Sequence, residues 1–282
     1  MKINSNEYWN TRFEKDWKEY GGEDQSRYFA RVLIEALPEW FKKDIRESNY
    51  SICDWGCAQG DGTDIFSTTF NKRVVGVDFS RVAVEQAKNK YSSSEFLNLN
   101  FLDETIRPEI KFDIVMSSNT LEHFYEPFKI LNALKDFSSS LLIISVPYEE
   151  IKRIDEHHFT FLSDNIPLSL GDNWKLLLHR EVDCRNHQPS FWPGKQIILV
   201  YCRQEWIETK NLTVSDITTS SSFDALYYSE ELFSKERKLE QLSIEHDNLI
   251  NQLDSCNKEL EFLKQLNSES LLKKMAMRIF RK

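Results

Sequence analysis

The sequence lacks the signatures of several protein classes. Its five cysteines are scattered and form no Cys-x-x-Cys pair, which argues against a zinc site, and we expect no bound metal. The start, MKINSNEYWN, has no apolar segment of the secretory kind, and no apolar run approaches the roughly 18 residues of a membrane span. We therefore expect a cytoplasmic protein with reduced thiols. The net charge of −9 over 282 residues argues against a nucleic-acid partner.

One glycine-rich stretch also lacks the features of the common phosphate-binding loops. It reads CDWGCAQGDG and covers residues 53–62. Gly62 is followed by threonine and not by the lysine of a P-loop, and the glycine spacing does not match G-x-G-x-x-G. What remains is G-x-A-x-G, with Asp54 before it and Asp78 at the end of the next valine-rich segment. A carboxylate there can accept hydrogen bonds from ribose hydroxyls and suits a cationic sulfonium better than a pyrophosphate.

Short apolar segments alternate with segments of helical length through the middle of the chain. The sequence predicts strands near residues 50–55, 73–80, 95–101, 112–119 and 140–147, with helices between the first two and at 81–91 and 126–137. This alternation predicts an α/β fold with a parallel sheet covered on both faces. Two further strands, at 174–183 and 195–203, have no helix between them. We expect one of them to run antiparallel at the edge.

Residues 1–50 predict a helical cap with one break, ahead of a core at 51–206. Asp24 or Ser26 would cap a helix. The apolar face of that helix would hold Phe29, Val32, Leu33 and Leu37.

The composition changes after the core. Residues 207–222 are rich in Ser and Thr and predict a linker. In the heptads counted from Ala225, seven of twelve a and d positions are Leu, which predicts a coiled coil of about 60 Å over 223–267. The alternative is a single helix packed on the domain, for which the apolar seam is narrow. A coiled coil implies a homo-oligomer, and Ile250 at an e position favours a trimer over a dimer.

The last segment, 268–282, predicts a basic amphipathic helix. Its apolar residues recur at helical spacing, and opposite them lie Lys273, Lys274, Arg278, Arg281 and Lys282. Such a helix suits an anionic membrane surface, so we expect peripheral contact with the inner face of the cell membrane. The alternative is the frayed end of the coiled coil or a protein contact.

Over roughly residues 5–206 the sequence resembles the class I S-adenosylmethionine-dependent methyltransferases. ICDWGCAQGDG is similar to their first motif, VVGVDFS to their ribose-binding strand end, and LNFLDETIRPEIKFDIVMSSNTLEHF to their adenine-side segment and fourth strand. SVP and DEHHFTFLS follow the later pattern of the family. The resemblance implies a Rossmann-like seven-stranded, mostly parallel sheet and S-adenosylmethionine as cofactor.

The resemblance also implies residue roles. The backbone at Gly56, Ala58 and Gly60 would approach the methionine part, with Asp54 supporting the loop. Asp78 would hold the ribose, Phe79 would lie against the adenine, and Asn100 would bond its exocyclic amine beside Phe101. Asn119 would lie at a strand end that faces the ligand. A lid would contain Tyr8, Trp9 and Arg27, with Arg27 or its rival Arg12 pairing the cofactor carboxylate; simple packing is the alternative for Tyr8 and Trp9.

A hydroxyl acceptor needs a group that takes its proton, whereas an anionic phosphate does not. The candidates are Glu122, His123, His157 and His158. His123 follows the strand end that faces the cofactor and is the favoured base. His157 and His158 would lie on the loop after the fifth strand, also over the pocket.

The appended coiled coil and basic helix resemble the bacterial O-antigen chain-terminating methyltransferases, which also have a stretch similar to GCAQG. This resemblance implies a glycan acceptor, methylated at its non-reducing end. No kinase domain accompanies the methyltransferase region, which favours a sugar hydroxyl over a phosphate. Two alternatives are a methyltransferase for a small metabolite or lipid, and an inactive scaffold that recruits a glycosyltransferase partner.

Overall fold

The computed structural model describes residues 2–103, 111–171 and 173–210, residue 212 and isolated residues between 238 and 273. By its internal contacts the chain divides into two units, Met1–Ile217 and Thr218–Lys282. Most of the predicted linker, the coiled coil and the basic helix lie outside the described residues. The first unit carries the fold described below.

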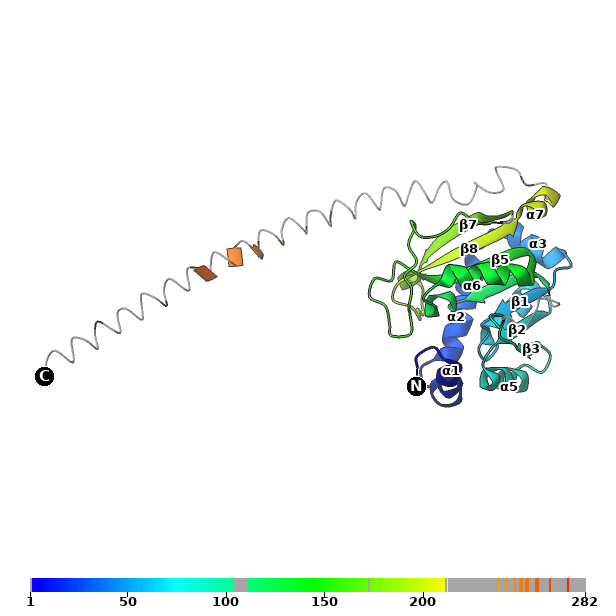
Figure 1. Cartoon of the computed structure of the whole chain (residues 1–282), viewed down its shortest axis with the longest axis horizontal. Helices are drawn as coiled ribbons and strands as arrows, with labels where there is room; N and C mark the ends of the chain where they lie inside the picture. Colours follow the sequence, from blue (N-terminus) through cyan, green and yellow to red (C-terminus); the bar gives the residue numbers. More distant parts are fainter. Residues whose placement is uncertain are drawn as a thin grey trace. The chain divides into compact units, whose positions relative to one another are not determined.

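A mixed sheet of eight strands forms the centre of the first unit, in the order β3-β2-β1-β4-β5-β8-β7-β6. Its first five strands run parallel, which confirms the predicted parallel core: β1 (Ile52–Trp55), β2 (Val74–Asp78), β3 (Glu95–Asn98), β4 (Phe112–Ser118) and β5 (Ser138–Tyr148) (Figure 1). The strand order reverses at β1, which pairs with both β2 and β4. Open α/β sheets bind ligands beyond the carboxyl ends of the strands at such a reversal.

The rest of the sheet differs from the prediction. β8 (Lys195–Arg203) runs antiparallel to β5 and to β7 (Trp174–Asp183), so the reversed strand lies inside the sheet and not at its edge. Its apolar run QIILVYC is buried throughout, whereas β7 is only partly buried. A continuous apolar strand needs cover on both faces, which an inner position provides. The short β6 (Ser169–Gly171) raises the strand number from seven to eight.

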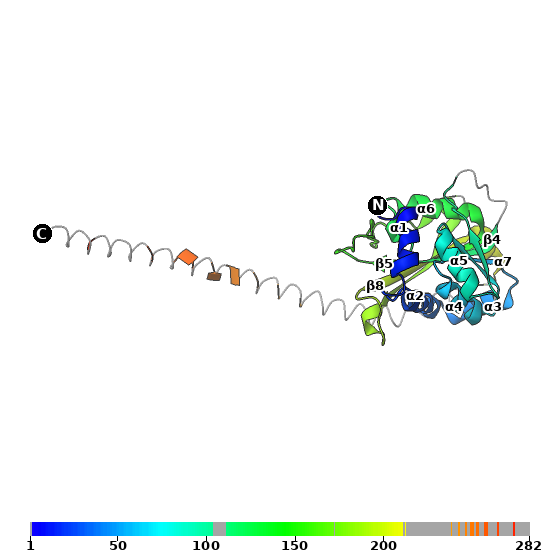
Figure 2. The same ribbon diagram turned by 90° about the horizontal axis from the view of Figure 1, so that it is seen from below.

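Helices cover both faces of the sheet (Figures 1 and 2). Even-numbered residues of β1 and β4 such as Ile52 and Ile114 form one core with α2, α3 and α4, and odd-numbered residues of the same strands such as Cys53 and Val115 form the other core with α6. α5 packs on β3 at Phe96. The bounds of these helices are α2 (Gly22–Ala36), α3 (Glu39–Glu47), α4 (Asp61–Phe70), α5 (Arg81–Lys90) and α6 (Pro127–Leu134).

The N-terminal cap has more breaks than the single one predicted. α1 (Asn6–Thr11) continues into a π-helix, Arg12–Asp16, and α2 begins after Gly21, whose φ of 70° ends the preceding turn. Neither Asp24 nor Ser26 caps α2. The predicted apolar face is confirmed, because Phe29, Val32, Leu33 and Leu37 are all buried.

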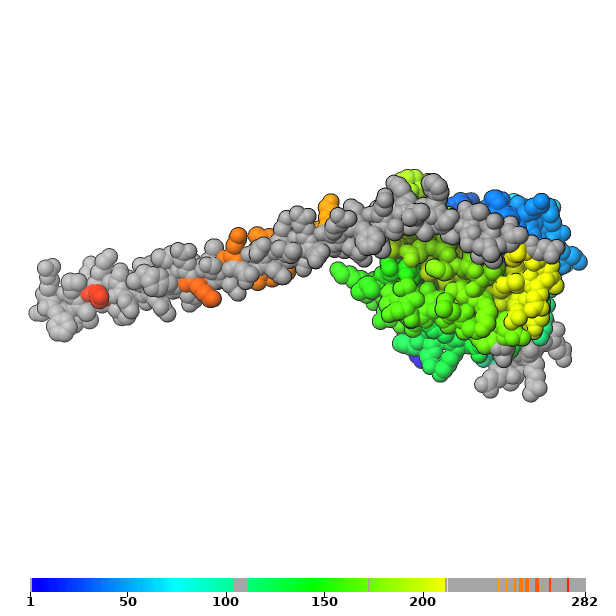
Figure 3. Space-filling view, turned by 90° about the horizontal axis from the view of Figure 1, so that it is seen from above, coloured from blue at the N-terminus to red at the C-terminus, as the bar shows by residue number. Residues whose placement is uncertain are grey.

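The end of the first unit also differs slightly from the predicted boundary at residue 206. Helix α7 (Gln204–Thr209) spans that boundary, and Trp206 and Ile207 pack into the core. Within the described residues, no helix combines the length and hydropathy needed to cross a bilayer. The isolated described residues of the second unit are helical and exposed (orange and red in Figure 3), among them Leu242, Leu249, Ile250 and Leu253.

Candidate active site

A cavity of about 680 Å³ lies at the carboxyl ends of β1, β2 and β4. Its walls come from the N-terminal segment, the glycine turn, the strand ends, the segments after β4 and β5, and the β7–β8 connection. The predicted site residues that line it are Trp9, Asp54, Gly56, Ala58, Asp78, Phe79, Asn100, Asn119, His123, His157 and His158. Tyr8, Arg27, Gly60 and Phe101 do not line it.

The glycine turn holds three residues in the left-handed region. Gly56, Ala58 and Gly60 have φ values of 78°, 49° and 83°. A Cβ on Gly56 would lie 2.4 Å from Thr120 Oγ1, and one on Gly60 would lie 2.6 Å from the Phe96 ring. Gly60 is therefore required by the turn and by packing rather than by contact with a ligand, whereas Gly56 and Ala58 present backbone to the cavity.

Two buried carboxyls flank this turn. Asp78 accepts hydrogen bonds from the backbone N–H groups of Ala58 and Ser80, at 3.0 and 2.8 Å. Burial raises the pKa of Asp78 to about 6, although these backbone donors act in the opposite direction. Asp54 accepts a hydrogen bond of 2.6 Å from the Thr63 hydroxyl, which joins β1 to α4, and burial raises its pKa to about 7.

Of the three residues predicted to surround the adenine, only two line the cavity. Phe79 and Asn100 line the cavity, and Asn100 Oδ1 accepts a hydrogen bond from the Leu102 backbone at 3.1 Å. Phe101 is buried away from the cavity and stacks on Phe137, with ring centroids 3.9 Å apart. Phe101 therefore does not reach the cavity, because its ring packs on Phe137 in the core.

The N-terminal segment contributes Trp9 and Arg12 rather than Tyr8 and Arg27. Tyr8 does not line the cavity, but its hydroxyl donates at 2.7 Å to Glu156, which does. Arg27 is held by Asp61 at 2.8 Å and by the Tyr91 hydroxyl at 2.9 Å, so it is not available to a cofactor carboxylate. Arg12 lines the cavity, and its buried Nε has no hydrogen-bond partner within the described part of the chain.

A cluster of acid and imidazole groups occupies the other side of the cavity. Glu122 and His123 lie in the short helix η2 (Leu121–His123) after β4, and His157 lies after β5. The rings of His123 and His157 meet edge to face, with centroids 5.1 Å apart. His158 lies apart from this cluster, stacked on Tyr125 at 4.1 Å.

Burial dominates the electrostatics of the cluster. It raises the pKa of Glu122 to about 7 and lowers that of His123 to about 4. Burial also acts to lower the pKa of His157, but the hydrogen bond to Glu150 and the nearby carboxylates outweigh it, so that the net shift is upward. His123 is therefore neutral near pH 7.

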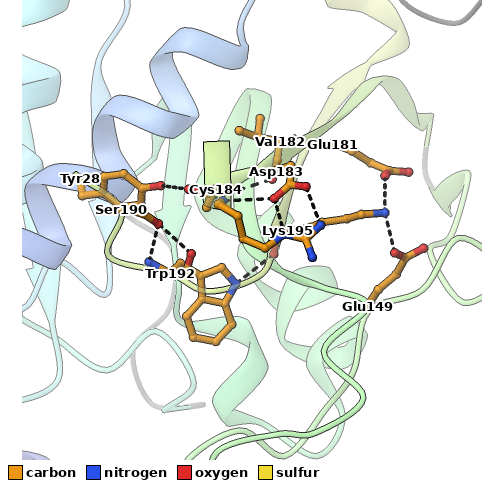
Figure 4. Close-up of polar contacts among 10 residues, drawn as sticks. Tyr28, Glu149, Glu181, Val182, Asp183, Cys184, Ser190, Trp192 and Lys195 are labelled. Atoms are coloured by element: carbon orange, nitrogen blue, oxygen red, sulfur yellow. Dashed lines mark hydrogen bonds and ion pairs between the residues drawn. The ribbon is translucent and has the colours of Figure 1, made fainter. Parts of the chain in front are cut away.

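The β7–β8 connection, residues 184–194, brings two aromatic side chains to the cavity that the sequence did not point to. Phe191 and Trp192 line it, and the Trp192 ring lies 5.8 Å from that of His157. Figure 4 shows how the connection is held: the Trp192 indole donates to the Lys195 carbonyl at 3.2 Å, and the Tyr28 hydroxyl donates to the Cys184 carbonyl at 3.4 Å. The one local signal is an aromatic pair inside the turn-rich stretch QPSFWPG.

Comparisons with known proteins agree with this architecture. Residues 46–181 match the family model described as a methyltransferase domain, and no curated protein matches the sequence. Magnesium protoporphyrin IX methyltransferase (ChlM) from Synechocystis PCC 6803 with bound SAH is similar in structure, with a TM-score of 0.52, 15% identity, and 71% of this chain and 98% of that chain covered. A chain from the complex between the Haloferax volcanii Trm112 methyltransferase activator and the putative methyltransferase is also similar in structure. Its TM-score is 0.54 at 15% identity, with 72% of this chain and 98% of that chain covered.

Residues 46–181 thus match a methyltransferase domain, and the chain shares the fold of its structural neighbours, with a cavity at the strand reversal. The ChlM structure holds SAH, the demethylated form of S-adenosylmethionine. The cavity residues fit this cofactor: each Asp78 carboxylate oxygen accepts one backbone hydrogen bond and keeps a lone pair for a ribose hydroxyl. Arg12 Nη2 lies 3.7 Å from Glu156 Oε1, but its Nε has no hydrogen-bond partner among the described residues, and the cavity volume is that of an ordinary ligand site.

Proposed function

We propose that the protein methylates a hydroxyl group at the non-reducing end of a bacterial surface glycan. The observation that carries the proposal is one cavity that joins a ribose-type carboxylate, Asp78, to an acid and imidazole cluster. When bound, S-adenosylmethionine supplies a methyl group on a cationic sulfonium, which is a good leaving group. The protein then has mainly to align donor and acceptor and to accept a proton.

On the cofactor side, Asp78 would receive the ribose hydroxyls, and Phe79 and Asn100 would border the base. The backbone at Gly56 and Ala58 would lie against the methionine part, where no side chain intrudes. Arg12 takes the place first expected for Arg27, since its Nε is buried without a partner among the described residues.

On the acceptor side, His123 would take the proton. Its Nδ1 lies 2.9 Å from the Glu156 carbonyl, so that the proton sits on Nδ1 and Nε2 keeps its lone pair. The acceptor oxygen forms the new C–O bond as the S–C bond breaks, the bonding pair stays on sulfur, and the hydroxyl proton passes to the imidazole. His157 and His158 would then orient the acceptor.

The glycan acceptor rests on the C-terminal segment. Its heptads would hold the catalytic unit at a distance from the membrane in a homo-oligomer, with a trimer favoured, and 268–282 would lie on the inner membrane surface. Leu242 and Leu249 occupy d positions of the predicted heptads and Leu253 an a position. All three are helical and exposed, which supports an apolar helix face that a second chain could cover. A small-metabolite or lipid acceptor, and a scaffold that recruits a glycosyltransferase, remain the alternatives.

The first experiment is calorimetric titration of S-adenosylmethionine into the wild type, Asp78→Ala and the exposed control Asp136→Ala. We expect binding in the wild type and the control, and at least a tenfold loss for Asp78→Ala, since charge-assisted hydrogen bonds are worth about 1.5–3 kcal/mol. Transfer of radiolabelled methyl to glycans then tests the acceptor. If the wild type did not bind the cofactor, the proposal of an active methyltransferase would be rejected, and the inactive scaffold would be the alternative that is left.

A further inference from the structure

The buried carboxylate of Glu122 has no hydrogen bond in the site as described. Its exposure is 0%, and neither carboxylate oxygen has a hydrogen-bond partner within the described residues, although the side chain borders the cavity. The nearest ionisable partner is His157, whose Nε2 lies 3.9 Å from Oε1 and thus beyond hydrogen-bond distance. Burying an unpaired carboxylate is costly, and a bound cation would offset that cost.

The two histidines beside Glu122 are each held by their other ring nitrogen. His123 Nδ1 lies 2.9 Å from the carbonyl oxygen of Glu156, and His157 Nδ1 lies 2.6 Å from Glu150 Oε2. In the neutral form of each ring, these acceptors place the proton on Nδ1 and leave the lone pair of Nε2 free. Metal-binding histidines are oriented in the same way, by a backbone carbonyl or a carboxylate on the second nitrogen.

The backbone also ties the two parts of the cluster together. The carbonyl oxygen of Glu122 accepts hydrogen bonds from the N–H groups of His158 and Phe159, at 2.7 and 3.2 Å. The segment after β5 is thereby held against η2, so His157 is placed beside Glu122 and His123 by the main chain and not only by its own side chain.

We infer that Glu122, His123 and His157 form a binding site for a divalent transition-metal ion. One ligand atom from each residue lies within 4.8 Å of the others. Metal bonds of about 2.0–2.2 Å put ligand atoms roughly 3–3.5 Å apart, so binding would draw the side chains inward by about 1 Å. Two imidazoles and one carboxylate suit Zn²⁺, Mn²⁺ or Fe²⁺ better than Ca²⁺ or Mg²⁺, which prefer oxygen ligands.

Three protein ligands leave coordination positions open towards the cavity. The role of the ion rests on the proposed function: it would bind the acceptor hydroxyl, lower the pKa of that hydroxyl and so generate the nucleophile, while the proton passes to solvent water. His123 would then be a ligand and not the base. The lack of cysteine pairs excludes a structural zinc site of the Cys-x-x-Cys kind and has no bearing on this cluster.

The test is a metal titration of the full chain in the absence of cofactor. Protein stripped with EDTA is titrated with ZnCl₂ and with MnCl₂ by calorimetry, and bound Mn²⁺ is followed by electron paramagnetic resonance. We expect one ion per chain. Glu122→Gln and His157→Gln should each weaken binding at least about 100-fold, and Glu150→Gln, which alters only the orienting carboxylate, about 10–100-fold. His158→Gln, a cavity histidine outside the cluster, is the matched control and should bind metal as the wild type does.

Absence of stoichiometric binding, or binding that survives both Glu122→Gln and His157→Gln, would overturn the metal site. Thermal unfolding of each variant shows whether a loss reflects misfolding, and the near-isosteric Glu150→Gln provides a second measure if a first-ligand variant fails to fold. Titration of S-adenosylmethionine into the same stripped protein separates the two proposals. Cofactor binding without metal binding removes only the metal site, and metal binding without cofactor binding removes only the methyltransferase proposal.

Discussion

At the scale of single residues, the carboxyls of Asp54 and Asp78 make stability depend on pH. Burial raises their pKa values to about 7 and about 6, above those of the unfolded chain. The folded protein therefore holds these protons more tightly, so the contribution of each group to the free energy of unfolding is lost as pH rises from about 4 through the folded pKa.

We predict that the wild type loses stability relative to Asp54→Asn as pH rises from 4 to 8, by on the order of a few kcal/mol, because only the wild type must bury a charge there. The Thr63 hydroxyl can still donate to the asparagine oxygen. Urea unfolding of the cofactor-free proteins across this range measures the difference. A constant difference would show that Asp54 has an ordinary pKa.

The glycine turn allows a second residue-scale prediction. Gly60→Ala combines a φ of 83° with a Cβ 2.6 Å from Phe96, whereas Gly171→Ala has a φ of 73° and no atom within 4 Å. We expect Gly171→Ala to cost about 1–2 kcal/mol, which is the price of the left-handed backbone, and Gly60→Ala to cost about 1–3 kcal/mol more through overpacking. If chemical denaturation gave the same loss of stability for both variants, the Phe96 ring would have to move aside at no cost.

Residues also show where prediction from sequence reaches its limit. Asp78 and Asn119 line the cavity as predicted because each lies at or just beyond the carboxyl end of a parallel strand, a position that the order of strands and helices determines. Arg27 and Phe101 do not, because Asp61 and Phe137 compete for them through the folded structure. Competition between tertiary partners leaves no local pattern in the sequence.

At the scale of elements, periodicity predicted the five parallel strands but not the place of β8. An apolar run such as QIILVYC indicates burial on both faces, but it does not say which neighbours provide the cover. The inner place of β8 has a consequence for the site. The connection from β7 returns to the carboxyl end of β5 and carries Phe191 and Trp192 to the cavity.

We predict that this connection serves the acceptor and not the cofactor. Trp192 lies 5.8 Å from His157, which we assign to the acceptor. Trp192→Ala should raise KM for the methyl acceptor about tenfold or more, since loss of a large aromatic contact is worth about 1–3 kcal/mol, and should leave the Kd of S-adenosylmethionine unchanged. Trp40→Ala, which removes an indole outside the cavity lining, is the control for general loss of aromatic packing. A matching loss of cofactor affinity would place Trp192 on the cofactor side.

At the scale of the whole molecule, the chain divides into two units, Met1–Ile217 and Thr218–Lys282. All predicted cofactor residues belong to the first unit, which has its own sheet and its own two main cores. The predicted heptads belong to the second, where Leu242, Leu249 and Leu253 are exposed, and we propose that a partner chain buries them.

Removal of residues 218–282 should therefore leave S-adenosylmethionine affinity unchanged while converting an oligomer into a monomer, as measured by calorimetry and by light scattering after gel filtration. Removal of 268–282 alone should keep the oligomer and abolish binding to vesicles that contain anionic lipids, because those residues carry five basic side chains against one acidic side chain, Glu269. Binding to neutral vesicles is the control for the electrostatic contribution. A full chain that is already monomeric would reject the coiled coil and, with it, the main support for a glycan acceptor. A shortened chain that still binds the vesicles would instead reject the role of the tail while leaving the oligomer in place.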